Sequence, residues 1–257
     1  MSDEEQNLTT NESKIAYDPE DNSLFDEYLK LERVDFATSP DEFKTRRTEF
    51  VESRISHYEE QIDFAVEDFK KNNVNIPPPS PETKRNAARL LANTELGVKL
   101  VYNRYDPNDM VDHKDVVFSA TSDEFKQDSP FCYLSKPVDK IGVQLQWLLE
   151  MSENPEKWYE DSKANGRVIG PINEDTIEDC VLFAGVEEAS HAIYISNTRD
   201  LNRGTPQSGR FYYAENVEFQ TLKVMSFFAN KYFPEYRSRM KDKLSEMVQY
   251  RKTQGIK

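Results

Sequence analysis

The chain has 257 residues and a mass of 30.0 kDa, enough to bury a core in one large domain or two small ones. Its net charge of −14 argues against binding of nucleic acid or an anionic membrane over the whole surface. No signal peptide is visible, no apolar run approaches the ~20 residues that cross a bilayer, and the two cysteines fit a reducing compartment. We therefore expect a cytoplasmic or virion-interior protein without nucleic-acid or membrane partners.

The N-terminal residues predict a solvated, disordered tail. Ser2 to Glu27 carry nine acidic side chains against one basic residue, Lys14, and few large apolar side chains. We assign residues 1–38 to this tail and residues 39–257 to a single helical domain.

Six segments of that domain show the apolar spacing of helices. The first two begin with the same signals, because Ser39 and Ser80 are each followed by a proline suited to the first helical position. The predicted helices span residues 39–72, 80–105, 138–152, 175–197, 211–231 and 234–251. Residues 106–136 and 153–173 are expected to be mostly irregular, with Val116–Phe118 as a short strand.

Three of the predicted helices carry a carboxylate on their apolar stripe. Glu95 lies at the centre of the second helix's stripe and Glu218 on that of the fifth. Glu188 and His191 both fall on the stripe of the fourth helix, where a spacing of three residues lets both bind one metal ion. A buried, ionised carboxylate must be compensated, and a metal ion, an Arg or Lys, or a raised pKa would each do so.

The run Glu187-Glu-Ala-Ser-His-Ala192 resembles the Glu-Glu-x-x-His-Ala run of the ferritin-like di-iron carboxylate superfamily, which includes bacterioferritins, rubrerythrins and the small subunit of ribonucleotide reductase. In such bundles two helices each supply a Glu and two others each supply a Glu-x-x-His. The resemblance implies an all-α, ferritin-like helical bundle, here with an extra N-terminal helix and an irregular middle insertion. It also implies a site for iron or manganese, as one or two ions, made of Glu95, Glu188, His191 and Glu218.

The sixth predicted helix departs from that pattern. Glu246-Met-Val-Gln249 has Gln where the second His is expected, and the apolar stripe of Met240, Leu244 and Met247 excludes Glu246. This departure leaves open a mononuclear site, a second ion with oxygen ligands only, or a site that has lost its metal.

Two other polar residues lie close to apolar stripes. His57, on the first helix, would fill the gap in the ligand set, but the simpler interpretation is a histidine that bonds to Glu60 or Gln61. For Gln144 we expect a hydrogen bond within the core rather than contact with a metal.

These observations favour two functions from different classes. With a metal, the protein would be a ferritin-like iron- or manganese-dependent oxidase or oxygenase that acts with O₂ or peroxide on a small molecule the sequence does not define. Without a metal, it would be a helical interaction or assembly protein in which Arg and Lys neutralise Glu95, Glu188 and Glu218. A mononuclear zinc or manganese hydrolase is a third interpretation, and a homo-oligomer stays open in each case.

Overall fold

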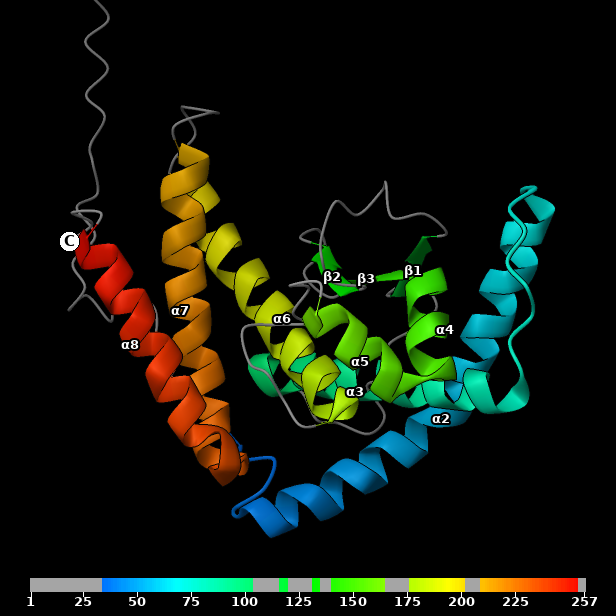
Figure 1. Ribbon diagram of the computed structural model, residues 1–257, viewed down its shortest axis with the longest axis horizontal. Helices are drawn as coiled ribbons and strands as arrows, with labels where there is room; N and C mark the ends of the chain where they lie inside the picture. The colour runs from blue at the N-terminus through cyan, green and yellow to red at the C-terminus, as the bar shows by residue number, and fades with distance from the viewer. Residues whose placement is uncertain are drawn as a thin grey trace, which may run out of the picture.

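The structure, a computed structural model, describes residues 34–103, 116–119, 131–134, 140–164, 176–201 and 209–253. These ranges are predominantly helical, which confirms the predicted all-α class (Figure 1). The α-helices within them are α2 (Pro40–Lys71), α3 (Pro81–Tyr102), α4 (Leu145–Glu153), α5 (Pro155–Ala164), α6 (Ile177–Leu201), α7 (Gly209–Tyr232) and α8 (Arg237–Thr253), with a short 3₁₀ helix, η1 (Pro234–Tyr236), before α8. None of the helices in the described ranges is both long and apolar enough to span a membrane.

The first two helices begin where local signals predict. Ser39 Oγ accepts a hydrogen bond from the Glu42 backbone N–H at 3.2 Å, and Ser80 Oγ accepts one from the Thr83 N–H at 3.0 Å. Each bond satisfies a donor that the helix itself leaves unpaired. α3 ends at Asn103, which adopts the left-handed conformation (φ 56°) that often stops a helix.

Residues 34–38, the last part of the predicted tail, are among the described residues. Residues 1–33, which include the whole acidic run, lie outside the described residues. Phe36 and Ala37 are buried, and Phe36 meets the Phe43 ring edge-on with the centroids 5.6 Å apart. The domain therefore begins a few residues before the first helix.

A small sheet replaces the start of the predicted third helix. β1 (Val116–Ser119) and β2 (Phe131–Leu134) lie on either side of β3 (Lys140–Gln144), parallel and antiparallel to it, respectively. The prediction of a short strand at Val116–Phe118 is confirmed, whereas that of a helix from residue 138 is wrong, because α4 begins only at Leu145. Residues 140–144 are strand because they pair with β1 on one side and β2 on the other.

The prediction of an irregular segment over residues 153–173 is also wrong in its first half, which forms α5. Asn154 Oδ1 accepts a hydrogen bond from the Lys157 N–H at 3.1 Å, and Pro155 occupies the first helical position. This start signal is the same kind as those of α2 and α3, so the sequence did contain it.

α3 and α6 cross at two glycines. A Cβ atom on Gly97 would lie 2.1 Å from the Leu182 carbonyl oxygen, and one on Gly185 would lie 2.2 Å from that of Thr94. Only glycine permits so close an approach of two backbones. The crossing fixes the position of α6 on α3 just before the Glu187–His191 segment.

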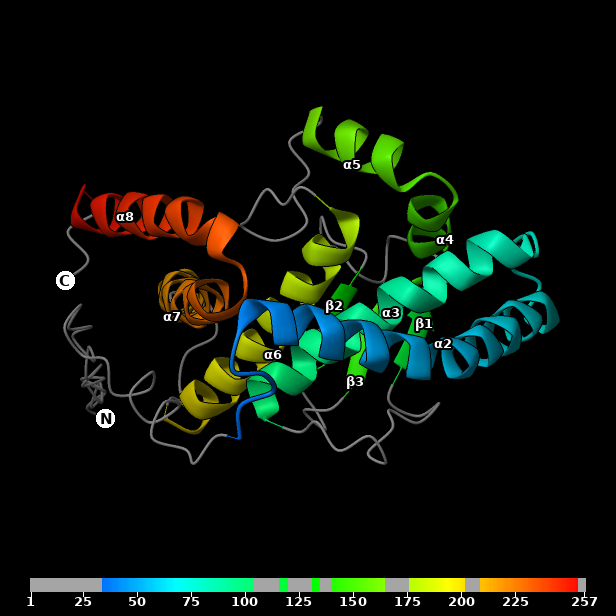
Figure 2. The same cartoon turned by 90° about the horizontal axis from the view of Figure 1, so that it is seen from below.

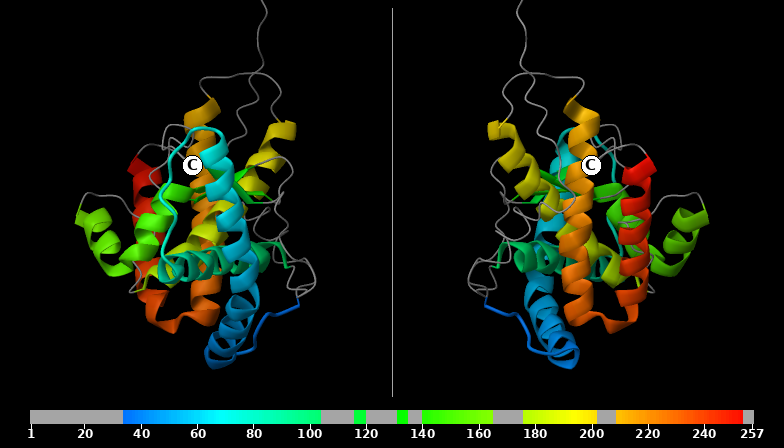
Figure 3. Two further views of the ribbon diagram at one scale, coloured as in Figure 1. Left: turned by 90° about the vertical axis from the view of Figure 1, so that its right-hand side faces the viewer. Right: turned by 90° about the vertical axis from the view of Figure 1, so that its left-hand side faces the viewer.

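α7 and α8 run side by side at one end of the molecule (Figures 1 and 3). In Figures 1 and 2, α7 runs steeply across α3 rather than along it. Helices of a four-helix bundle lie within about 20° of parallel. The steep crossing of α7 over α3 is unlike that arrangement, and the ferritin-like fold stays a prediction. The contact of α7 with α6 positions the candidate site.

Candidate metal site

The contact between α6 and α7 gathers three potential metal ligands. Glu187 and His191 on α6 and Glu218 on α7 each offer one ligand atom, and these atoms lie within 4.8 Å of one another. Glu187 and His191 are four residues apart, so they share a face of α6. All three side chains are partly buried.

The imidazole of His191 has a carboxylate on each side. Its Nε2 lies 3.1 Å from Glu218 Oε1, and its Nδ1 lies 3.9 Å from Glu188 Oε2, an ion-pair distance longer than a hydrogen bond. The Glu218 side chain is 43% exposed, whereas those of His191 and Glu188 are 18% and 16% exposed. The site is therefore closed on the α6 side and reached by solvent at Glu218.

The crowding of carboxylates changes how the site binds protons. Burial is the main cause that raises the pKa of Glu187 to about 8; Glu188 and Glu218 contribute to this rise, while His191 and Lys243 oppose it. Burial acts to lower the pKa of His191, but pairing with Glu188 and Glu218 outweighs it and holds this pKa well above its usual value. Both groups of the folded protein therefore keep their protons to a higher pH than an ordinary carboxyl or imidazole group does.

Glu95 lies elsewhere and does not belong to this group. Its fully buried carboxylate lies between α2 and α3, with Arg54 Nε 3.3 Å from Oε2 and Lys99 Nζ 3.6 Å from Oε1. Tyr58 Oη also donates a hydrogen bond to Oε2 at 3.0 Å. The inclusion of Glu95 in the metal site is corrected: it faces inward as predicted, but cations from the protein itself neutralise it.

The structure brings together His191 and Glu218, and it adds Glu187, which the sequence analysis had not selected. The apolar stripe led to Glu188, three residues before His191, but Glu187 is four residues before it and lies on the same helix face. The double glutamate was the signal, because either residue has helical spacing to the histidine. The structure places Glu188 beside Nδ1, away from the Nε2 side of the ring.

The two other inward polar residues stay apart from the cluster. His57 Nε2 lies 2.6 Å from Gln61 Nε2, a hydrogen-bonding contact within α2 that matches the simpler interpretation of that histidine. Gln144 is buried at the end of β3, where α4 begins.

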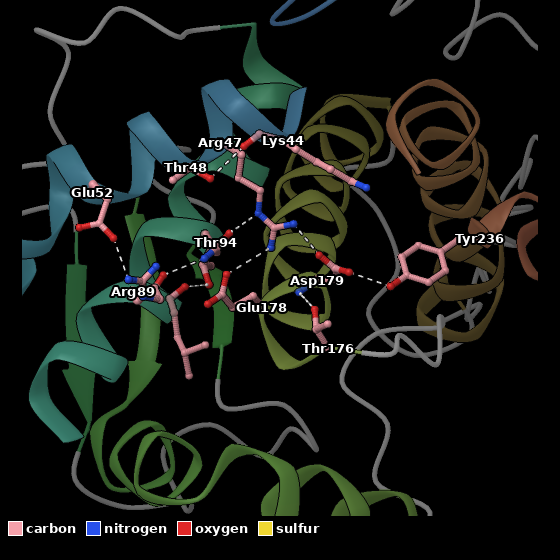
Figure 4. Close-up of polar contacts among 12 residues, drawn as sticks. Lys44, Arg47, Thr48, Glu52, Arg89, Thr94, Thr176, Glu178, Asp179 and Tyr236 are labelled. Atoms are coloured by element: carbon pink, nitrogen blue, oxygen red, sulfur yellow. Dashed lines mark hydrogen bonds and ion pairs between the residues drawn. The ribbon is translucent and has the colours of Figure 1, made fainter. Parts of the chain in front are cut away.

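A second polar network fixes the start of α6 (Figure 4). Arg47 Nη1 on α2 lies 2.5 Å from Asp179 Oδ1, and Tyr236 Oη in η1 donates to Asp179 Oδ2 at 2.7 Å. Arg47 Nε also donates to Asn93 Oδ1 on α3 at 2.7 Å. The network ties four elements together, and its arginine balances its carboxylate, so its chemistry is that of a structural ion pair.

No family model, curated protein or solved structure matches this chain. Two carboxylates and an imidazole from two packed helices form a mixed oxygen and nitrogen donor set with one solvent-accessible side.

Proposed function

We propose that this protein is a helical metal-binding protein, which holds a divalent transition-metal ion, iron or manganese, between α6 and α7 through Glu187, His191 and Glu218. The observation that carries the proposal is the convergence of three ligand atoms from two helices within 4.8 Å. A mixed set of imidazole nitrogen and carboxylate oxygen suits Fe, Mn or Zn, whereas Mg²⁺ and Ca²⁺ favour oxygen ligands.

The electrostatics of the cluster support a cation there. Glu188 and Glu218 both pair with the single imidazole of His191, and Glu187 retains a proton to a pKa of about 8. A divalent ion would replace the protons on Glu187 and His191, because metal ligands bind in their deprotonated forms. Its charge would also relieve the repulsion among the three carboxylates.

The ligand count leaves room for chemistry. Three protein ligands do not fill the coordination sphere of a transition metal, and the open positions of such sites accept water or substrate. Access from solvent lies on the side of Glu218, whose side chain is 43% exposed. Bound iron or manganese would supply oxidation that depends on O₂ or peroxide, as in the oxidase expected from the sequence.

Metal analysis tests the proposal directly. Metal-free protein is dialysed against Mn²⁺, Zn²⁺ or, without oxygen, Fe²⁺, and its metal content is measured after removal of free ions. We expect stoichiometric metal in the wild type and its loss in Glu187→Gln, His191→Gln and Glu218→Gln. Glu246→Gln, which removes an exposed acid of α8, is the matched control and should bind as the wild type does.

Oxygen consumption then separates the possible chemistries. Iron-loaded protein that consumes O₂ would support the oxidase, whereas bound zinc or manganese without O₂ consumption would favour the mononuclear hydrolase. Wild-type protein that takes up none of these ions would contradict the metal-binding proposal.

One observation favours the alternative of a metal-free interaction or assembly protein. Glu95 is neutralised by Arg54 and Lys99, as that alternative requires of each inward carboxylate. In that case His191 and Glu218 form a simple ion pair. A chelator would then leave the thermal stability of freshly isolated protein unchanged, whereas a metal protein should lose stability when the ion is removed.

A further inference from the structure

We infer that the site holds a single metal ion and that Glu188 is a positioning residue, which orients the His191 ring rather than binding or bridging metal. The inference rests on the proposed function and deepens it. It differs from the two-ion arrangement that the sequence resemblance left open, in which each carboxylate of the set would be a ligand.

The two nitrogens of the His191 ring face different carboxylates. Nε2 lies 3.1 Å from Glu218 Oε1, and Nδ1 lies 3.9 Å from Glu188 Oε2. Glu218 belongs to the three-ligand group and Glu188 does not. A neutral imidazole offers a lone pair at one nitrogen and carries hydrogen at the other. The geometry therefore assigns Nε2 as the ligand atom, and the Nδ1–H side of the ring faces Glu188.

Glu188 lies on the Nδ1 side of the His191 ring, where it can orient that ring. Metal-bound histidines commonly direct their other N–H at a carboxylate, which fixes the tautomer and the ring orientation. Glu188 is three residues before His191 on α6, so the helix backbone holds the two side chains in register. Its side chain is 16% exposed, against 18% for His191, so the two side chains are enclosed together on the α6 side of the site.

The available carboxylates suit one ion rather than two. Two adjacent ions are best neutralised by bridging carboxylates, and Glu95 and Glu188 are the members of the predicted ligand set that lie outside the three-ligand group. Arg54 and Lys99 already neutralise Glu95, and Glu188 lies beside Nδ1. Within the described residues, the ligand group consists of Glu187, His191 and Glu218. That set of one nitrogen and two carboxylates suits one ion.

Manganese binding to the full chain tests both parts of the inference. We expect the wild type to bind about one Mn²⁺ per chain, with the electron paramagnetic resonance spectrum of an isolated ion. Glu188→Ala should keep this stoichiometry but weaken the affinity about 10- to 100-fold, as losses of such orienting partners do. Glu188→Gln retains an acceptor oxygen, so its affinity for Mn²⁺ should lie between those of the wild type and Glu188→Ala. Glu187→Gln, in contrast, removes a ligand and should abolish stoichiometric binding.

A spectroscopic measurement distinguishes orientation from a general structural effect. In the zinc-loaded wild type, nitrogen-15 NMR of His191 should show metal at Nε2 and hydrogen at Nδ1. In Glu188→Ala the Nδ1 hydrogen should exchange faster with solvent, while circular dichroism confirms an unchanged fold.

Several results would overturn the inference while leaving the proposed function in place. These are two magnetically coupled Mn²⁺ ions per chain, ligation through Nδ1, an unchanged affinity in Glu188→Ala, or complete loss of stoichiometric binding in that variant. A wild-type protein that binds no metal would overturn the proposed function itself, and this inference with it.

Discussion

Glu95 is buried and the carboxylates of Glu187, Glu188 and Glu218 are partly buried, and the protein compensates their charge in two different ways. At Glu95, between α2 and α3, Arg54 and Lys99 lie within ion-pairing distance of the two carboxylate oxygens. At the α6–α7 contact, Glu188 and Glu218 pair with one imidazole, and Glu187 keeps its proton to a pKa of about 8.

The difference shows that a buried carboxylate can be neutralised by basic side chains in one part of the fold and can hold a proton in another. A carboxylate between an arginine and a lysine is electrically satisfied and has little reason to bind an external cation. Three carboxylates around one histidine compete for positive charge, and protons or a metal ion can supply it. The partner helix, rather than the glutamate, decides which case applies.

The largest expected effect on stability is at Glu95. Glu95→Ala leaves Arg54 and Lys99 buried without their carboxylate, so we expect a loss of about 3–5 kcal/mol in the free energy of unfolding. Urea denaturation measures this loss. The triple variant Arg54→Met/Glu95→Leu/Lys99→Met should recover much of it, because it removes the three buried charges together. Loss of metal binding in a folded Glu95 variant would contradict the separation of Glu95 from the metal site between α6 and α7.

Metal affinity at the cluster should depend steeply on pH. Glu187 and His191 must each lose a proton to act as ligands, so the affinity should rise about 10- to 100-fold per pH unit between about pH 6 and 8. The contribution of Glu187 should level off above its pKa of about 8. Calorimetric titration in buffers of different ionisation enthalpy measures the released protons. An affinity that does not change over this range would argue against these two ligands.

The helix crossing should affect both centres, because α3 carries Glu95 and α6 carries the cluster. In Gly97→Ala the new methyl group would lie 2.1 Å from the Leu182 carbonyl oxygen, and backbone cannot move aside as a side chain can. We expect a loss of about 1–3 kcal/mol in the free energy of unfolding, with weaker metal binding as α6 shifts. Ser245→Ala, on the exposed side of α8, is the control. Unchanged stability would contradict the close approach of the two backbones.

In the metal-free protein, Glu187→Gln should change how the free energy of unfolding depends on pH. The pKa of Glu187 is about 8 in the folded protein against an ordinary value of 4.5, so the folded state binds an extra proton between those values. Wild-type stability from this group is thus highest below about pH 4.5 and falls as the pH rises to about 8. His191, whose pKa is also raised, acts in the same sense. The variant lacks the Glu187 titration, so its stability relative to the wild type should increase with pH across that window. Urea unfolding in the presence of a chelator measures the difference in free energy of unfolding between the variant and the wild type. A difference that falls as the pH rises would contradict the raised pKa of Glu187.

The smallest effect is expected at an exposed ion pair. Glu52 pairs with Arg89 at 2.7 Å and with Arg85 at 3.2 Å, but the Glu52 side chain is 42% exposed (Figure 4 shows the Arg89 pair). Glu52→Gln should cost less than about 1 kcal/mol in urea denaturation, since water solvates these charges almost as well. A loss as large as that of Glu95→Ala would contradict burial as the reason why the Glu95 ion pairs matter more to stability than those of Glu52.

Helix starts were readable because their causes are local. Ser39 and Ser80 bond to backbone N–H groups three residues later, so a short stretch of sequence contains both partners. Asn154 and Pro155 form the same kind of start at α5, and only the polarity of the segment hid it. The strand at 140–144 was not readable in this way, because its extended conformation depends on β1 and β2.

The sequence alone determined that the chain is helical and that Glu95, Glu188, His191 and Glu218 lie toward the helix interfaces, since apolar periodicity is a property of each helix by itself. Only the tertiary structure decided which groups meet: Arg54 of α2 faces Glu95 of α3, and Glu218 of α7 faces His191 of α6. These contacts join residues far apart in the chain, and they depend on how closely the helices cross, which periodicity does not encode.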